Sequence, residues 1–258
     1  MEKKLIDAAI SGDAPLVAEI LTNNSDIDIN WRHENISGRA TAHWMANKGF
    51  GFILGILLTH PNIDVNQRDN SGCTPLLLAC EAGNFDPVGV LLKDFRVDVN
   101  EPNYESHTPL YRAAFSGSIF VIQTWIASGR EMNLGRPGKY TDVILIAQER
   151  GNTEALTLLE RFKENPVETR HQVRLKSGWY DEAAAEIFAL AVFVSDGLLQ
   201  VTRGNHPTTT PTAKFVAVAS HLPLELQMVL CYRVAGSAKE IIPNDVRELA
   251  FKILGNAL

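Results

Sequence analysis

The sequence predicts a mainly α-helical protein: a solenoid of about five helix pairs followed by a small C-terminal helical bundle. The main observation is a repeated motif, or phrase, of the form aliphatic-Asp-aliphatic-Asn. It ends at Asn30, Asn66 and Asn100, and a degenerate copy ends at Asn133. These asparagines are 36, 34 and 33 residues apart. A period of that length in a helical sequence is typical of arrays whose units bury their apolar surface only against their neighbours.

Each predicted unit contains two helices separated by a glycine. Thr74 and Thr108 are both followed by proline and apolar residues, which predicts an N-cap and the first turn of a helix. Gly83 and Gly117 end these helices, because glycine readily takes the left-handed conformation that closes a helix. Apolar residues at helical spacing then predict a second helix, as over residues 88–92.

The two phrases together resemble the ankyrin repeat. Consensus positions of that family are occupied in the third unit by Asp69, Gly72, Thr74, Pro75, Leu76, Ala79, Gly83, Leu91, Leu92, Asp98, Val99 and Asn100. The second unit is degraded, with Ala40 and Thr41 in place of Thr-Pro, and the fifth has one extra residue before Gly151. The resemblance implies β-hairpin tips and an array over residues 1–165, with units of about 1–30, 31–66, 67–100, 101–133 and 134–165.

Partners of the resembling family contact the hairpin tips and the exposed face of each first helix, which together form a concave groove. The resemblance therefore implies a non-catalytic scaffold that binds another protein and needs no cofactor or metal. Carried over position by position, the candidate partner-binding residues are Arg39, Asn47, Lys48, Asn70, Ser71, Cys73, Glu81, Tyr104, Glu105, His107, Arg112 and Phe115.

Tyr104 and Phe115 are the foremost candidates in this set. Tyrosine and arginine are enriched at interface hot spots, and Arg39, Arg68 and Arg112 are expected near these two rings. The alternative is that they are ordinary exposed aromatic residues, which need no partner.

The recurring Asp and Asn have a structural explanation, since both satisfy backbone groups in turns and tolerate turn conformations. We expect this role rather than a recurring functional site. The resemblance also implies an alternative, because asparagines at the position of Asn66 and Asn100 are targets of an asparaginyl hydroxylase in the family.

The repeat pattern stops at Pro166, and a polar stretch over 169–177 leads into a predicted C-terminal helical domain, residues 166–258. Its first long helix is expected over 180–199. The segment from Leu222 to Leu230 faintly resembles an F-box, which implies an alternative function as an adaptor that recruits a ubiquitin ligase or another effector. A proline in the first turn of an amphipathic helix also explains these residues.

Composition narrows the function classes. The 258 residues are 45% hydrophobic and 21% charged, which is ordinary for a soluble globular protein. The net charge of −6 falls on the predicted array without a basic stripe, which argues against nucleic-acid binding. Three cysteines without metal or redox spacing favour a reducing compartment, cytoplasm or nucleus. We expect an intracellular monomer without a membrane span.

No sequence signature of catalysis is present. Gly135 to Lys139 looks like a phosphate-binding loop but lacks the spacing and the strand-loop-helix context of one. An enzyme in the C-terminal region is therefore the least favoured alternative.

Overall fold

A computed structural model describes residues 1–32, 37–139, 141–181, 183–185, 187 and 231 of the chain. The chain divides into two compact units, residues 1–173 and 174–258. Residues 1–173 contain the repeats. This division lies eight residues beyond the boundary that the repeat pattern predicts at residue 165.

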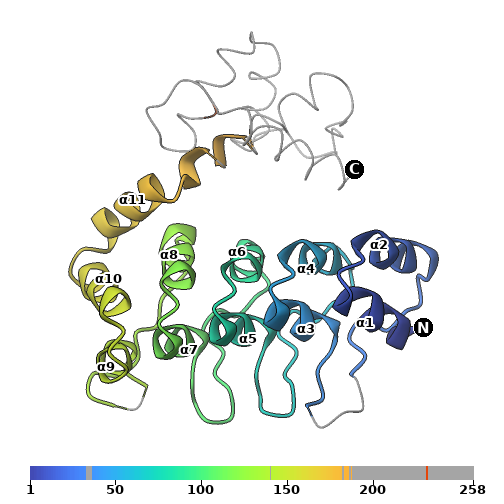
Figure 1. The fold of residues 1–258 in the computed structure, drawn as a ribbon, viewed down its shortest axis with the longest axis horizontal. Helices are drawn as coiled ribbons and strands as arrows, with labels where there is room; N and C mark the ends of the chain where they lie inside the picture. Colours follow the sequence, from blue (N-terminus) through green and yellow to red (C-terminus); the bar gives the residue numbers. More distant parts are fainter. Residues whose placement is uncertain (33–36, 140, 182, 186, 188–230, 232–258) are drawn as a thin grey trace, which may run out of the picture. The chain divides into compact units, whose positions relative to one another are not determined.

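The repeats within residues 1–173 form a stack of five helix pairs in two rows (Figure 1). The inner row consists of α1 (Glu2–Ile10), α3 (Thr41–Lys48), α5 (Pro75–Ala82), α7 (Pro109–Ser116) and α9 (Val143–Glu149). The outer row consists of α2 (Ala14–Asn23), α4 (Gly51–Leu58), α6 (Phe85–Lys93), α8 (Ile119–Ser128) and α10 (Thr153–Glu164). Each helix packs against the equivalent helices of the neighbouring pairs, which confirms the predicted solenoid.

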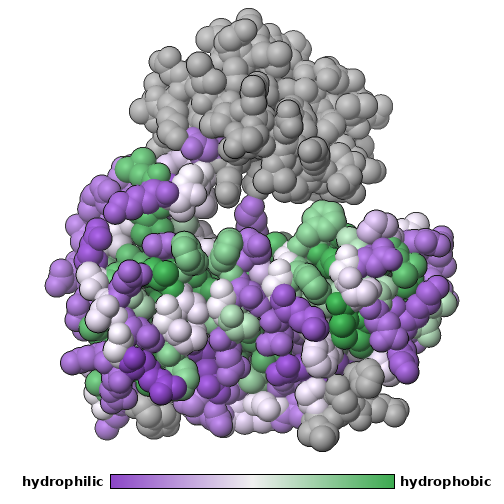
Figure 2. Space-filling model, in the orientation of Figure 1, coloured by the Kyte–Doolittle hydropathy of each residue, from purple (hydrophilic) through white to green (hydrophobic). Residues whose placement is uncertain are grey.

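The core repeats with the sequence. Leu57, Leu91, Trp125 and Leu159 stand at 34-residue intervals on the outer helices, and all four are fully buried. Burying each such side chain stabilises the fold by about 1.5–3 kcal/mol. Figure 2 shows the complementary surface, with mainly hydrophilic residues over the inner helices and tip loops and apolar residues interspersed along the outer row.

The predicted helix starts form as expected in the third and fourth units. The hydroxyl of Thr74 accepts a hydrogen bond from the amide of Leu77 at 3.3 Å, and that of Thr108 accepts one from Tyr111 at 3.2 Å. The glycines that close α5 and α7 have φ of +76° and +71°. The repeated Thr-Pro phrase therefore sets where each inner helix begins.

The fifth unit uses a different cap. Asp142 is the N-cap of α9, and its Oδ1 accepts hydrogen bonds from the amides of Ile144 and Leu145. Nine residues separate Asp142 from Gly151, as nine separate Thr108 from Gly117. The extra residue of this unit thus belongs to the loop before the helix.

The second unit replaces the missing threonine cap with a histidine. The amide of Ala40 donates to Nδ1 of His43 at 3.2 Å, and Nε2 of the same ring lies 2.8 Å from the carbonyl oxygen of Gln67. This pattern fits a neutral ring that accepts at Nδ1 and donates at Nε2. Burial lowers the pKa of His43 from its ordinary value of 6.5 to about 4, so the ring is neutral at physiological pH.

The tips between units are loops, and no β-strand occurs in the described residues. Backbone and side chains both close them. The amide of Asp69 donates to the carbonyl of Cys73 at 2.9 Å, and the amide of Asn103 donates to that of His107 at 3.0 Å. Oδ1 of Asp69 accepts from the amides of Ser71 and Cys73, both at 2.9 Å, and Oδ1 of Asn103 accepts from the corresponding amides one unit later. The described residues of these tips form tight turns without assigned strands, so the expected β-hairpins are not confirmed.

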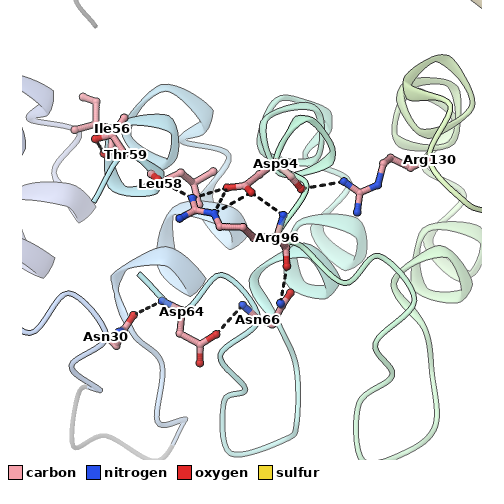
Figure 3. A network of polar contacts seen from close by, with 9 residues as sticks. All are labelled: Asn30, Ile56, Leu58, Thr59, Asp64, Asn66, Asp94, Arg96 and Arg130. Carbon is pink, nitrogen blue, oxygen red and sulfur yellow. Dashed lines mark hydrogen bonds and ion pairs between the residues drawn. The ribbon is translucent and has the colours of Figure 1, made fainter. Parts of the chain in front are cut away.

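The Asp-x-Asn phrase joins consecutive units (Figure 3). Asn30 accepts a hydrogen bond from the amide of Asp64 and donates one to the carbonyl of Asn62. Asn66 repeats this pattern with Asp98 and Arg96, at 2.8 Å each. The structural interpretation of the phrase is confirmed for these two steps.

Arginine side chains also join the units from the second to the fourth. Arg96 donates to the carbonyl of Leu58 in the preceding unit, and Arg130, at the equivalent position, donates to the carbonyls of Leu92, Asp94 and Val97. At this step Oδ1 of Asn100 is buried without a partner among the described residues. Arginine side chains therefore supplement the asparagine ladder toward the end of the array.

One helix was absent from the sequence prediction. Residues Pro166–Lys176 form α11, capped by Asn165, whose Oδ1 accepts from the amide of Glu168 at 3.1 Å. The sequence analysis expected only a polar stretch over 169–177, but proline at the first helical position leaves no hydrogen bond unmade. Val173 of this helix is buried in the core.

The predicted C-terminal bundle and the F-box-like segment from Leu222 to Leu230 lie outside the described residues, apart from helical residues at 179–181, 183–185, 187 and 231. Within the part of the chain that the structure describes, none of the helices has the length and apolar character needed to cross a bilayer.

Replacing Asn66 with alanine tests the ladder. The variant leaves the amide of Asp98 and the carbonyl of Arg96 without their partner, so we expect the free energy of unfolding in urea to fall by about 1–3 kcal/mol. Asn133→Ala is the matched control, because Asn133 accepts from the amide of Gly135 in its own loop and bonds no other unit among the described residues. Equal losses in the two variants would contradict a coupling role for Asn66.

Acidification should weaken the array through His43. The unfolded chain binds a proton on this residue below about pH 6.5, whereas the folded chain does so only near pH 4. Stability is therefore lost as the pH falls through this window, by roughly 2 kcal/mol between pH 7.5 and pH 5. Urea unfolding of His43→Gln should show a shallower pH dependence than the parent; parallel curves would refute the assignment.

Candidate functional site

The predicted site residues gather most densely around α7. Glu105, on the tip loop before this helix, accepts from Nη2 of Arg112 at 3.0 Å, and Glu81 on α5 lies 3.5 Å from Nη1 of the same guanidinium. Nδ1 of His107 is 3.1 Å from the Glu105 carboxylate. Four predicted residues from two units thus form one charged cluster.

Tyr111 completes this cluster. Its ring stacks on that of His107 with 4.5 Å between centroids and an interplanar angle of 2°. Burial raises the pKa of the Tyr111 phenol, while the positive charges of Arg112 and Arg150 act in the opposite direction. The hydroxyl consequently stays protonated and available as a hydrogen-bond donor at neutral pH.

Phe115 lies under two guanidinium groups. Cζ of Arg150 is 3.6 Å from the ring centroid and Cζ of Arg112 is 6.0 Å from it. Both distances fall within the range of cation–π attraction, which is strongest for the nearer group. Phe115 is accordingly half-buried and not the freely exposed ring that the repeat consensus predicts.

Tyr104 is exposed at the tip of the fourth unit, with 68% of its surface accessible. Its backbone amide donates to the carbonyl of Ser71, and its ring lies against Gly72, where an added Cβ would come within 2.7 Å of Cδ1. Arg68 is 5.6 Å from the ring centroid. The expected pairing of Tyr104 with Arg68 is therefore present, and the backbone of the preceding tip holds the ring in place.

The remaining predicted residues lie in earlier units. Arg39 donates to the buried carboxylate of Asp69 at 3.2 Å and lies 5.6 Å from the ring centroid of Trp44, so it is engaged within the array and not beside Tyr104 or Phe115. Lys48, Asn70 and Ser71 are exposed and Asn47 is half-buried; the carbonyl of Asn47 accepts from the side chain of Asn84.

Cys73 is a correction to the predicted set. Only 5% of the residue is exposed, and it packs with Leu77 and Leu78. The amide of Cys73 donates to Oδ1 of Asp69, and the side chain lies in the core and not on the tip. Burial raises the pKa of the thiol to about 11, so Cys73 is a core residue without thiolate character.

A shallow hollow of about 260 Å³ lies between α7, α9 and the loop before α9. It is lined by Tyr111, Gly138, Lys139, Asp142, Leu145, Ile146 and Glu149. Small-molecule sites commonly enclose about 300–1,000 Å³. A hollow that is smaller and open to solvent suits one side chain of a bound peptide.

Glu149 and Arg150 were missed by sequence reasoning. They stand 34 residues after Phe115 and Ser116, two positions that the repeat consensus leaves exposed. The extra residue of the fifth unit hides its alignment with the other units in the sequence. That residue lies in the loop and leaves the register of α9 unchanged. Aligning the unit on Asp142 in place of Thr141 would have identified both residues.

The site offers recognition chemistry: guanidinium groups, carboxylates, a phenol and aromatic rings. Among the residues described by the structure, no group of three or more His, Cys, Asp or Glu side chains is arranged to hold a metal ion.

Comparison with known proteins adds two findings. Residues 5–103 and 42–136 match a family described as ankyrin repeats in three copies, and the two ranges together span just over half of the chain. A stretch of 60 residues is 40% identical to SMC5-SMC6 complex localization factor protein 1 of Mus musculus. This stretch covers 23% of the present chain and 6% of that relative.

Cysteine alkylation tests the correction at Cys73. We expect Cys73 to resist iodoacetamide in the native protein at pH 8 and to react in urea, because the nucleophile is the thiolate and burial suppresses it. Ser71→Cys provides a matched exposed thiol two residues away, which should react in the native state. Peptide mass spectrometry would disprove the buried placement by showing equal native reactivity at both positions.

Proposed function

Because the chain belongs to the ankyrin-repeat family, whose arrays serve protein–protein interaction and are typically non-catalytic, we propose that it is a scaffold that binds another protein. The proposed surface is the concave face, made of the tip loops and the inner helices. The observation that carries this proposal is that the Glu81–Arg112–Glu105 cluster and Phe115 meet at α7, while Tyr104 is exposed on the tip loop next to Glu105.

The physical character of this cluster supports the proposal. Tyrosine and arginine are the residues that most often dominate binding energy at protein interfaces. Arg112 is oriented by two carboxylates and Tyr104 by the neighbouring tip, so both side chains lose little freedom when a partner binds. Pre-organised side chains of this kind favour affinity.

The mouse relative supports the same class of function in general terms. It is named as a localization factor for a protein complex, and an array that holds another protein in place would act in that way. Since the match covers 6% of that relative, its partners are not carried over. An intracellular, monomeric scaffold remains our proposal for the setting in which this chain works.

Affinity capture from an extract of the source organism, with quantitative mass spectrometry, tests this function. The full-length chain carrying Tyr104→Ala, Glu105→Ala and Phe115→Ala should lose its main partner by at least about tenfold, since hot-spot truncations cost about 2 kcal/mol or more each. Circular dichroism melting would verify that the variant still folds.

The control replaces two exposed rings of the outer row, Phe85→Ala and Phe120→Ala, which lie on α6 and α8. This variant should retain the partner. Retention by the triple variant together with loss in the outer-row control would place binding on the opposite row and reject the proposed surface.

A further inference from the structure

We propose that the inner-helix face of the fourth and fifth units binds an acidic segment of the partner, with Arg150 receiving a carboxylate and the adjacent hollow receiving a neighbouring apolar side chain. This inference rests on the proposed function and specifies the chemistry of the partner. The inference rests on the contacts of Arg150, the charged residues around it and the hollow beside it.

Arg150 is ordered and uncommitted. It is exposed at the end of α9, and the Phe115 ring holds its guanidinium at 3.6 Å. Within the described part of the chain, no carboxylate or carbonyl accepts a hydrogen bond from the Arg150 guanidinium. A cation–π contact uses the charge of the group and leaves its N–H donors free, and a planar guanidinium matches the geometry of a carboxylate.

Arg112, which lies on the same ring, differs because both of its Nη atoms are paired with carboxylates, although its Nε is buried without a partner among the described residues. Its guanidinium also approaches Phe115, but its charge is paired with the carboxylates of Glu81 on α5 and Glu105 on the tip loop before α7. Arg150 belongs to the next unit and lies one helical turn beyond Ile146, the residue that corresponds to Arg112. Carboxylates therefore pair with the first guanidinium, whereas none among the described residues pairs with the second.

The surrounding charges reinforce this difference. Arg136 and Lys139, on the loop before α9, are exposed and form no ion pair within the described residues. The nearby carboxylate of Asp142 is engaged, since its oxygens accept from the amides of Gly138, Ile144 and Leu145. Arg136, Lys139 and Arg150 are therefore exposed cations without an ion pair among the described residues, and Glu149 is the exposed carboxylate among the residues that line the hollow.

The hollow beside these groups indicates what accompanies the carboxylate. Leu145, Ile146 and the Tyr111 ring give it apolar walls, and Lys139 and Glu149 form part of its edge. Its volume of about 260 Å³ accommodates one side chain of leucine or phenylalanine size. An acidic residue next to an apolar residue in an extended peptide would satisfy both features.

A nucleic acid fits this surface less well than an acidic peptide. Glu81, Glu105 and Glu149 are exposed around the cations and would repel a continuous phosphate backbone. A peptide can place one carboxylate at Arg150 and present neutral or basic groups to these glutamates. The charge pattern therefore favours a protein segment with localised negative charge.

Selection from a displayed random-peptide library, with the full-length chain as bait, tests the inference with a defined probe. We expect enrichment of Asp or Glu next to an apolar residue. A synthetic peptide from this selection should bind Arg150→Glu at least about tenfold more weakly and Arg150→Lys by an intermediate amount. Lys163→Glu on α10 is the matched charge control and should bind like the parent.

Three results would overturn the inference. They are selected peptides that lack acidic residues, selected peptides that bind Arg150→Glu like the parent, and displacement of the peptides by a single-stranded oligonucleotide whose own binding depends on Arg150. In each case the proposed function is judged separately. It survives if Tyr104→Ala with Glu105→Ala weakens the selected peptides, and it fails if neither this variant nor Arg150→Glu affects any of them.

Discussion

Hydrogen bonds from the side chains of one unit to the backbone of the next are the constraint on which the array depends. Asn30 and Asn66 each satisfy an amide and a carbonyl of the following unit, and Arg96 and Arg130 reach back to the preceding one. Together with one buried apolar residue per unit, such as Trp125, these bonds fix the spacing of the helix pairs. Stability and geometry are therefore built from nearest-neighbour terms, as expected for a solenoid.

Fixed spacing has a functional consequence. Positions 34 residues apart become neighbours on the inner face, so residues that vary between units meet across the array. Glu81, Phe115 and Glu149 occupy one such position, and the contacts from Arg112 to Glu81 and from Arg150 to Phe115 both cross a unit boundary. The repeated residues hold the scaffold, and the variable residues between them supply the chemistry of a surface that can be specific for one partner.

Sequence reasoning predicted the parts that depend on local, repeated signals. The caps at Thr74 and Thr108 and the asparagine ladder follow from residue types whose bonding is short-ranged. It failed at Cys73 and Arg150, whose roles depend on packing or on contacts one unit away, and it did not predict α11, whose sequence is mostly polar. His43 also links two units, since its ring accepts from the amide of Ala40 and lies 2.8 Å from the carbonyl oxygen of Gln67 in the next unit.

The central claim is that the variable residues of the inner face form the functional surface. Hydrogen–deuterium exchange of the full-length chain, with and without the partner isolated by affinity capture, measures this most directly. The account predicts protection over the tip loop at 101–107, α7, and the loop and helix at 134–150, with α4, α6 and α8 unchanged. Protection confined to α4, α6 and α8, with the inner helices unaffected, would contradict it.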